Sequence, residues 1–422
     1  MFRLILVLPV LFFVGCGELD QPSNEKVVGG EVIVDLSGNT VKASLIAEQT
    51  PGVDAETIVY GYKAYKIPYT TTDEEGNSVE VSGLMVVPTG LPDIVYSSLG
   101  LSMVSDGHET IFSNAEAPTI VAGSTNAPAG PPILLSSLGG FVTLQADYVG
   151  FGDSLDHYHP FVLKKSLANA TVDFIKAAKV FATNNDINLN GQLFLSGYSE
   201  GGYTALATLQ KIEAEEELQV TLAAPMAGPY AVEELAKGVL SVDTIPIPSF
   251  MANVAYAYSI AYDIDIASVV NEPYASSLDS LLDGSKTRTE VDAELTTKTT
   301  GLDGLFHPQF VTEYLSEEDN WFNIEARAND VHTWMPQTPV RLVHCLGDDV
   351  IPYGMSELTK GTMDYIAGLH GQQIDVQIVP VEIAVTQDPD TALRYGHVEC
   401  GSVAYSVATK MFADTRALTI GY

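Results

Sequence analysis

Residues 191–202 read Gly-Gln-Leu-Phe-Leu-Ser-Gly-Tyr-Ser-Glu-Gly-Gly, and this stretch decides the fold. The apolar residues 193–195 predict a short buried strand, residues 198–200 a sharp turn, and the residues from about Gly201 a helix. Ser199 lies in the turn, with Gly197 two positions before it and Gly201 two positions after it. This G-x-S-x-G spacing is typical of a serine nucleophile held on a strained strand-to-helix turn, where larger side chains at the glycine positions would collide.

The context of the motif decides between two interpretations. Glycines and serines also gather in ordinary turns of α/β proteins, so the spacing by itself is a weak signal. Here an apolar strand precedes the motif, and residues 204–212 follow it with helical periodicity. The N-terminus of that helix points backbone N–H groups at the reacting centre, which suits a developing oxyanion. We therefore interpret Ser199 as a catalytic nucleophile.

Composition places the chain among globular proteins with an acidic surface. The 422 residues are 46% hydrophobic and 18% charged, which predicts one large domain with an insertion, or two domains. The 20 Lys and Arg residues against 54 Asp and Glu residues give a net charge of −34. Such a surface repels phosphate backbones and anionic headgroups, so we expect no nucleic-acid partner. Solubility, in particular at high salt, explains the acidic surface sufficiently.

The N-terminus has the pattern of an export signal. Arg3 precedes an apolar run at residues 4–14, which is too short to span a bilayer but suits a signal-peptide core. The run ends in Gly15-Cys16, which resembles a bacterial lipoprotein signal, in which the cysteine is lipidated and becomes the mature N-terminus. We predict a signal peptide at 1–15, lipidation of Cys16 and a flexible tether at 16–30. The protein would then be a cell-envelope lipoprotein, with the outer membrane favoured, or a secreted or periplasmic protein if cleavage occurs without lipidation.

Strands alternate with helices through the rest of the chain, after an opening hairpin. This order predicts an α/β fold with a mostly parallel eight-stranded sheet and helices on both faces. The expected strands are 59–69, 79–87, 94–98, 141–146, 193–195, 218–224, 340–346 and 374–379, and the clearest helices are 166–183, 356–369 and 401–412. The stretch 225–339, after the sixth strand, is far longer than a connection needs, so we expect a helical cap there. The core is then 31–224 together with 340–422.

An acid and a base follow Ser199 in the order that a serine hydrolase of this fold requires. Asp348 and Asp349 come directly after a late strand, and of this pair we favour Asp348 as the acid. His397 follows the last strand, in a loop before the final helix, where the base is expected. His344 falls within a predicted strand and is interpreted as a core or supporting residue. His157 and His159 lie in a loop, either lining the site or at the surface.

A serine hydrolase also needs two hydrogen-bond donors for the oxyanion. We expect one to be the backbone N–H of Glu200, the residue after the nucleophile, and the other to be that of Leu101, after the third predicted strand. No Cys, His and Asp cluster has metal-ligand spacing, so the sequence implies neither a metal nor a cofactor.

The cysteines suggest a disulfide beside the site. Setting Cys16 aside leaves Cys345 and Cys400, and an isolated pair in an oxidising compartment is a disulfide candidate. Cys345 lies three residues before Asp348, and Cys400 lies three residues after His397. Because the acid and base loops must be adjacent for catalysis, the cysteines are expected to be close too. The alternative is two buried free thiols.

Several segments together resemble a known family. They are Tyr65-Lys-Ile-Pro-Tyr-Thr, Ser82-Gly-Leu-Met-Val-Val-Pro, Ala146-Asp-Tyr-Val-Gly-Phe-Gly-Asp-Ser, Gly197-Tyr-Ser-Glu-Gly-Gly, Asn329-Asp-Val-His-Thr-Trp-Met-Pro and Gly347-Asp-Asp-Val-Ile-Pro-Tyr. In this order they look like the α/β-hydrolases related to secretory lipases, including bacterial lipase/esterase-like relatives. The resemblance covers about residues 45–415. It implies a capped α/β-hydrolase fold acting on carboxylic esters, often of lipids, with Ser199 as nucleophile, Asp348 as acid and His397 as base.

The chain departs from the pattern of these relatives at two places. It has Leu99-Gly100 where such enzymes often have His-Gly, and its acid loop contains a cysteine, as His344-Cys-Leu-Gly-Asp348. We expect an exported serine lipase or esterase that acts through an acyl-enzyme on a small-molecule or lipid ester, bound to a membrane through Cys16. The alternatives are a secreted serine peptidase or amidase with the same triad, or a non-catalytic surface lipoprotein that binds ligands. The acyl chain and the alcohol of the substrate stay open.

Overall fold

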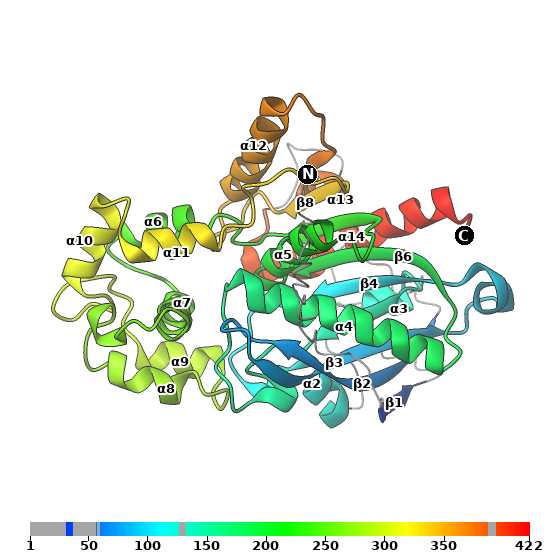
Figure 1. Ribbon diagram of the computed structural model, residues 1–422, viewed down its shortest axis with the longest axis horizontal. Helices are drawn as coiled ribbons and strands as arrows, with labels where there is room; N and C mark the ends of the chain where they lie inside the picture. Colours follow the sequence, from blue (N-terminus) through cyan, green and yellow to red (C-terminus); the bar gives the residue numbers. More distant parts are fainter. Residues whose placement is uncertain (1–30, 37–55, 57–59, 126–131, 387–393) are drawn as a thin grey trace, which may run out of the picture.

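A twisted nine-stranded sheet forms the centre of the molecule (Figure 1). The computed structural model describes residues 31–36, 56, 60–125, 132–386 and 394–422. The strand order is β1-β2-β3-β5-β4-β6-β7-β8-β9. The strands are β1 (Glu31–Leu36), β2 (Gly61–Thr72), β3 (Ser78–Thr89), β4 (Leu101–Gly107), β5 (Val142–Ala146), β6 (Leu189–Tyr198), β7 (Leu222–Met226), β8 (Val340–His344) and β9 (Val376–Pro380).

The sheet is antiparallel at one edge and parallel elsewhere. Strands β1, β2, β3 and β5 pair antiparallel, and β5, β4, β6, β7, β8 and β9 pair parallel. The eight strands from β2 onward agree in number with the predicted sheet, but one of them, β4, lies at other residues than predicted. Strand β1 comes from the N-terminal extension and adds a ninth at the antiparallel edge.

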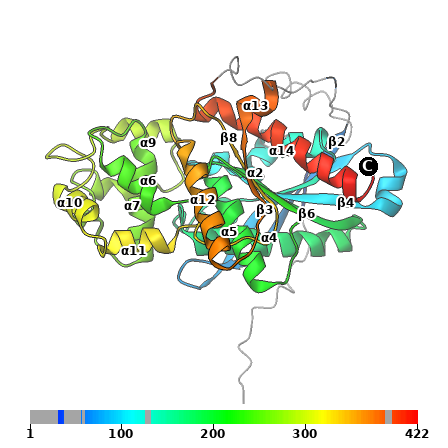
Figure 2. The same ribbon diagram turned by 90° about the horizontal axis from the view of Figure 1, so that it is seen from above.

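Helices cover both faces of the sheet. They are α2 (Pro118–Thr125), α3 (Pro132–Ser137), α4 (Lys164–Asn184), α5 (Glu200–Glu215), α12 (Gly354–Leu369), α13 (Val381–Thr386) and α14 (His397–Thr419). Figure 2 shows α4, α5 and α12 on one side of the sheet and α13 and α14 on the other. Parallel strands joined by helices need this covering, because both faces of such strands are apolar.

Alternate residues of β6 supply the two halves of the core. Leu193 and Leu195 pack on the side of α4 and α5, while Phe194 packs on the side of α14, against Phe141 and Phe412. These three side chains are each at most 4% exposed. Burying a side chain of this size stabilises the fold by about 1.5–3 kcal/mol relative to exposure. The buried strand therefore fixes the position of the turn that follows it.

A helical segment separates β7 from β8, at the place where the sequence predicts the cap. Its helices are α6 (Val232–Leu240), α7 (Pro248–Ala261), η5 (Ile266–Ser268), η6 (Ala275–Ser277), α8 (Leu278–Leu281), α9 (Arg288–Glu294), α10 (Pro308–Ser316) and α11 (Trp321–Ala328). They gather at one end of the sheet (Figure 1). The aromatic side chains of α7, α10 and α11 pack mostly on one another, as Tyr258 does on Phe322.

One predicted strand is wrong. Residues 94–98, expected as the third strand, belong instead to a turn of π-helix, η2 (Val95–Leu99), which ends where the Gly100 N–H donates to the Val95 carbonyl. The strand at this place in the sheet is β4, in a stretch where the sequence predicts no strand. The chain between β4 and β5 also contains η3 (Asn114–Glu116), α2 and α3.

The predicted signal peptide, the lipidation site Cys16 and the tether lie outside the described residues. Within the stretches that the structure does describe, no helix has both the length and the apolar character needed to cross a membrane.

Candidate active site

Ser199 occupies the turn between β6 and α5. Its backbone has φ 58° and ψ −119°, a conformation that is strained for any residue with a side chain. The Ser199 N–H donates to the Met226 carbonyl at the end of β7, at 2.9 Å, which holds the turn against the sheet. The turn therefore has the strand-to-helix geometry that the sequence predicts.

Two glycines of this turn are required by close backbone contact. A Cβ atom on Gly201 would lie 1.9 Å from the Gly107 carbonyl oxygen, and one on Gly202 would lie 2.3 Å from the Met226 carbonyl oxygen. Neither distance is possible for a real side chain, so the start of α5 packs directly against the ends of β4 and β7. This packing brings the loop after β4 beside Ser199.

His397 is the first residue of α14 rather than part of a loop before it. Its Nε2 atom lies 3.0 Å from Ser199 Oγ, and its Nδ1 atom lies 2.7 Å from Asp348 Oδ2. Because the carboxylate can only accept, Nδ1 carries the proton and Nε2 is free to accept the serine hydroxyl proton. Tyr198 supports this arrangement, since its hydroxyl donates to the His397 carbonyl at 2.6 Å.

The two neighbouring aspartates bind different parts of His397. Asp348 contacts the imidazole, and its other oxygen accepts the N–H groups of Val350 and Ile351 at 3.0 and 2.8 Å. Asp349 accepts the backbone N–H of His397 at 2.9 Å, which compensates the positive end of the α14 dipole. The geometry thus agrees with Asp348 as the acid.

His344 gives Asp348 a second imidazole contact. Its Nε2 atom lies 3.4 Å from Asp348 Oδ2, and both side chains are fully buried. Burial alone would raise the pKa of Asp348, but the hydrogen bonds of His344 and His397 together outweigh it and hold that pKa well below its usual range. The carboxylate therefore stays ionised near neutral pH. His344 is the supporting residue that its position in a strand predicts.

Cys345 and Cys400 form a disulfide with a Cα–Cα distance of 6.0 Å. Cys345 follows β8, and Cys400 lies in the first turn of α14, so the bond joins the acid loop to the helix that begins with His397. Both cysteines are fully buried. The disulfide expected from the sequence is present in the structure.

Leu101 is wrong as an oxyanion donor. It begins β4, where it pairs with Leu189, whereas the far end of β4 pairs Gly107 with Gly197 beside the nucleophile. The Leu101 N–H is also occupied, because it donates to the Asn188 carbonyl at 2.7 Å. The error follows from the wrong third strand. The donor is expected in the loop after this strand, and because the strand is β4 rather than 94–98, that loop begins with residues 108–110.

A cavity of about 560 Å³ reaches Ser199 from the side of helices α6 and α7. Most of its walls are aliphatic and aromatic side chains of α6, α7, the stretch 242–247 between them and the start of α12. Thr110 and Glu200 line it beside the nucleophile. Among the described residues that line the cavity, the charged ones are Glu200, Glu234 and Asp349, all acidic, and none is Lys or Arg. The arrangement suits a neutral, apolar group next to the serine.

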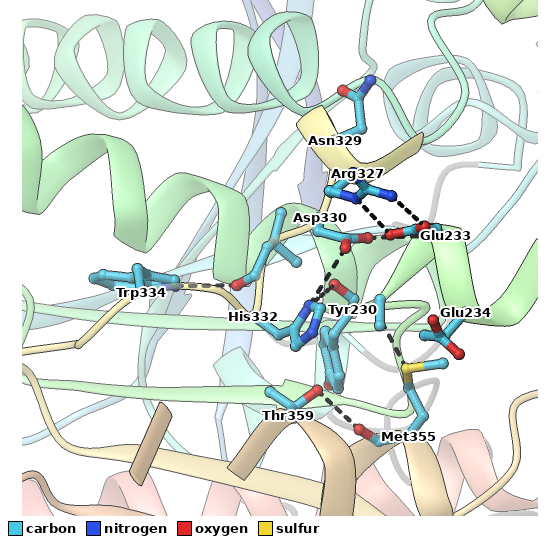
Figure 3. A network of polar contacts seen from close by, with 12 residues as sticks. Tyr230, Glu233, Glu234, Arg327, Asn329, Asp330, His332, Trp334, Met355 and Thr359 are labelled. Carbon is cyan, nitrogen blue, oxygen red and sulfur yellow. Dashed lines mark hydrogen bonds and ion pairs between the residues drawn. The ribbon is translucent and has the colours of Figure 1, made fainter. Parts of the chain in front are cut away.

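A polar network connects the N-terminus of α6 to the residues that follow α11 (Figure 3). The Glu233 N–H donates to Asp330 Oδ1 at 3.3 Å, and Asp330 Oδ2 lies 3.9 Å from His332 Nδ1. Arg327 binds the Glu233 carboxylate through two nitrogens, at 2.9 and 2.8 Å. Burial raises the pKa of Asp330 to about 7. Asp330 and His332 belong to one of the segments that carry the family resemblance, but the sequence predicts no contact for either residue.

Sequence reasoning also misses a pair behind the nucleophile. His159 Nε2 lies 2.7 Å from Glu200 Oε1, and both side chains are buried. The two residues are 41 positions apart, so no local pattern connects them. His157 lies nearer the surface, with 39% of its side chain exposed. In the described parts of the chain, no group of three or more His, Cys, Asp or Glu residues is arranged to hold a metal ion.

Comparison with known families identifies the chain. The model of the secretory lipase family matches residues 133–377, which is more than half of the sequence. The chain belongs to the secretory lipase family. Its reaction class is therefore the hydrolysis of carboxylic esters, and membership of a secretory family indicates an exported protein. A comparison with curated proteins found no match.

Solved structures confirm the α/β-hydrolase fold of this lipase. A protein from Legionella pneumophila superposes with a TM-score of 0.76 at 21% identity, covering 93% of this chain and 98% of that one. The rice cell wall degrading esterase LipA from Xanthomonas oryzae gives 0.73 at 21% identity, covering 94% and 98%. Candida antarctica lipase A gives 0.59 at 15% identity, covering 85% and 77%.

Proposed function

We propose that this lipase cleaves esters through an acyl-enzyme on Ser199, with His397 as general base and Asp348 as the acid that orients it. The observation that carries the proposal is the continuous chain of contacts from Ser199 Oγ through the imidazole to Asp348, at 3.0 and 2.7 Å. Such a relay makes the serine hydroxyl nucleophilic. His397 takes the hydroxyl proton as Oγ attacks the ester carbonyl carbon, then gives it to the leaving alcohol. Water releases the acyl group in the reverse sequence.

The oxyanion hole is formed by the backbone N–H groups of Glu200 and Thr110. Glu200 is the first residue of α5, so its N–H has no acceptor inside the helix and is available to the oxyanion. Thr110 borders the cavity beside Ser199 and follows Gly107 and His108, whose carbonyl oxygens lie against Gly201. The second donor in this proposal thus lies in the loop after β4, at the C-terminal end of the strand, whereas Leu101 lies at its N-terminal end.

The acyl group occupies the apolar cavity under the cap. Residues 225–339 form that cap on a core of 31–224 and 340–422, and the cavity lies between cap helices α6 and α7 and the start of α12. Its acidic and apolar lining favours neutral acyl groups over anionic ones. Lipidation of Cys16 would keep the enzyme at the surface of a membrane that contains such substrates.

A chain-length profile of p-nitrophenyl esters tests the proposal. The chain starting after Gly30 is assayed with acyl groups from acetyl to palmitoyl, beside its Ser199→Ala variant. We expect the wild type to hydrolyse these esters and the variant to lose more than about 10⁴-fold in kcat/KM, because the nucleophile is gone. Labelling by a fluorophosphonate probe should disappear in parallel. Hydrolysis that survives in Ser199→Ala at a comparable rate refutes the mechanism.

A further inference from the structure

The carboxyl group of Glu200 is buried directly behind the nucleophile, where it hydrogen-bonds to His159. Glu200 is 1% exposed, and its Oε1 atom lies 2.7 Å from His159 Nε2. The other ring nitrogen, His159 Nδ1, lies 3.1 Å from the Val149 carbonyl oxygen. Phe151 and Phe161 pack against the ring, with centroid distances of 4.9 and 6.1 Å. The acyl-enzyme mechanism uses the backbone of Glu200 but gives neither of the two side chains a role.

The contacts of His159 fix the number of protons in the pair. A carbonyl oxygen only accepts, so Nδ1 must carry a proton to bond Val149. A neutral imidazole with its proton on Nδ1 has a lone pair on Nε2, and an ionised Glu200 offers only lone pairs as well. A contact of 2.7 Å therefore requires one more proton between Nε2 and Oε1. Whether the pair is imidazolium and carboxylate or imidazole and carboxylic acid, its total charge is zero.

An uncompensated charge at Glu200 would oppose the reaction. The N–H of this residue faces the oxyanion, and a bare carboxylate on the same residue would repel it in a site with little water to screen the repulsion. Glu200 Oε2 has no hydrogen-bond partner among the residues that the structure describes. His159 therefore compensates the negative charge of Glu200, either as an imidazolium cation or by giving the carboxylate a proton.

The other titratable groups near Glu200 cannot replace His159. His108 and Tyr148 are the two that face the carboxyl group from the loops after β4 and β5. Burial lowers the pKa of His108, which keeps that imidazole neutral near pH 7. Burial also raises the pKa of Tyr148 well above its usual range, so that hydroxyl stays neutral too. Neither group provides a positive charge.

We propose that His159 is a positioning residue for ester hydrolysis, which shares a proton with Glu200 and so keeps the oxyanion hole free of negative charge. The inference rests on the proposed acyl-enzyme mechanism at Ser199. The same contact ties the loop after β5 to the first turn of α5, and thereby holds the Glu200 N–H in place.

Three variants test the pair on a short-chain p-nitrophenyl ester. His159→Gln leaves the carboxyl group of Glu200 without its shared proton, and we expect kcat to fall about 100-fold at pH 8 with little change in KM. The ratio of its kcat to that of the wild type should rise as the pH is lowered, because protons from solvent then compensate the negative charge that His159 no longer compensates. The double variant His159→Gln/Glu200→Gln carries no charge and should regain at least about ten-fold over His159→Gln. His157→Gln, in the same loop but nearer the surface, is the matched control and should behave as wild type.

A role in structure alone predicts a different result. The kcat ratio would then be independent of pH, and the double variant would be no better than His159→Gln, which would overturn the proposal. Should His159→Gln not fold, proton NMR of the Ser199→Ala chain decides the question. We expect a downfield resonance for the shared proton that vanishes in Ser199→Ala/Glu200→Gln, and its persistence there would refute the pair. These outcomes leave the Ser199→Ala activity test unaffected, so the two proposals fail separately.

Discussion

At the scale of single residues, the site depends on which of two adjacent aspartates faces the imidazole. Asp348 and Asp349 follow β8 on the same short loop, and their side chains diverge around His397. Asp348 is bound to the ring and to two backbone N–H groups, whereas Asp349 accepts the His397 backbone N–H. Asp348 thus orients the imidazole ring, and Asp349 holds the first residue of the helix that carries this ring.

Asparagine substitutions separate these two roles. We expect Asp348→Asn to lower kcat about 10⁴-fold, because an amide at this position stabilises the wrong imidazole tautomer. Asp349→Asn should lower kcat less than about ten-fold, because the amide oxygen can still accept the His397 N–H. Steady-state kinetics at pH 8, with thermal denaturation to check folding, measures both. Equal losses in the two variants would contradict the assignment of the acid.

The candidate site residues that chain order singles out lie in contact with one another in the structure. Ser199, His397 and an aspartate after β8 are expected from order alone. The choice between Asp348 and Asp349 depends on how one loop bends, which is a tertiary property. The pairing of Glu200 with His159 is tertiary as well, because it joins the first residue of α5 to the loop after β5, and their proximity follows from the sheet.

At the scale of elements, buried polar side chains explain the strand that sequence analysis misplaced. β4 reads Leu-Ser-Met-Val-Ser-Asp-Gly and is buried throughout, although its composition looks like a loop. Ser102 binds Gln192 at 2.8 Å, and Asp106 accepts from Ser196 and Gln145 at 2.6 and 3.0 Å. Because these partners lie on neighbouring strands, the polar residues are satisfied inside the sheet. Hydropathy alone does not reveal this compensation.

Helix α6 offers a test of where the acyl group binds. Val239 is half-buried on this helix and lines the cavity. Val239→Trp fills part of the cavity. We therefore expect kcat/KM for decanoyl and longer esters to fall at least about ten-fold, while kcat/KM for acetyl and butyryl esters changes little. The p-nitrophenyl ester series measures this shift. Val180→Trp, at a 44% exposed position on α4, is the matched control. An equal loss at all chain lengths would place the acyl group elsewhere.

At the scale of the whole molecule, the predicted architecture is correct where it rests on alternation of strands and helices. The parallel sheet and the long insertion after β7 follow from this pattern, and the nine-stranded sheet differs from the expected one by an edge strand. The contacts between the insertion and the sheet could not be predicted, because they join segments that are distant in sequence. Lys164 at the start of α4 thus reaches the Asp330 carbonyl. Asp330 in turn binds the start of α6 (Figure 3).

Asp330 makes the stability of this junction depend on pH. Burial raises its pKa to about 7 in the folded protein, against about 3.9 in an unfolded chain. The folded state therefore binds more protons than the unfolded state between these values. The free energy of unfolding contributed by Asp330 is full below about pH 4 and is lost as the pH rises through about 7. The charged groups that face it are Lys164, Glu233 and, when protonated, His332.

Asp330→Asn removes this titration while keeping an oxygen for the N–H groups of α6. We expect its free energy of unfolding, relative to wild type, to rise between pH 5 and pH 8 by on the order of 2 kcal/mol. Urea denaturation at pH 5, 6.5 and 8 measures the difference. Burial also raises the pKa values of Asp106 and Asp147, but their contributions cancel because both proteins contain them. Asp156→Asn, with a side chain 86% exposed, is the control and should show no such trend. A difference that stays constant with pH would mean that Asp330 does not hold its proton in the fold, and that the junction between core and cap is equally strong across this range.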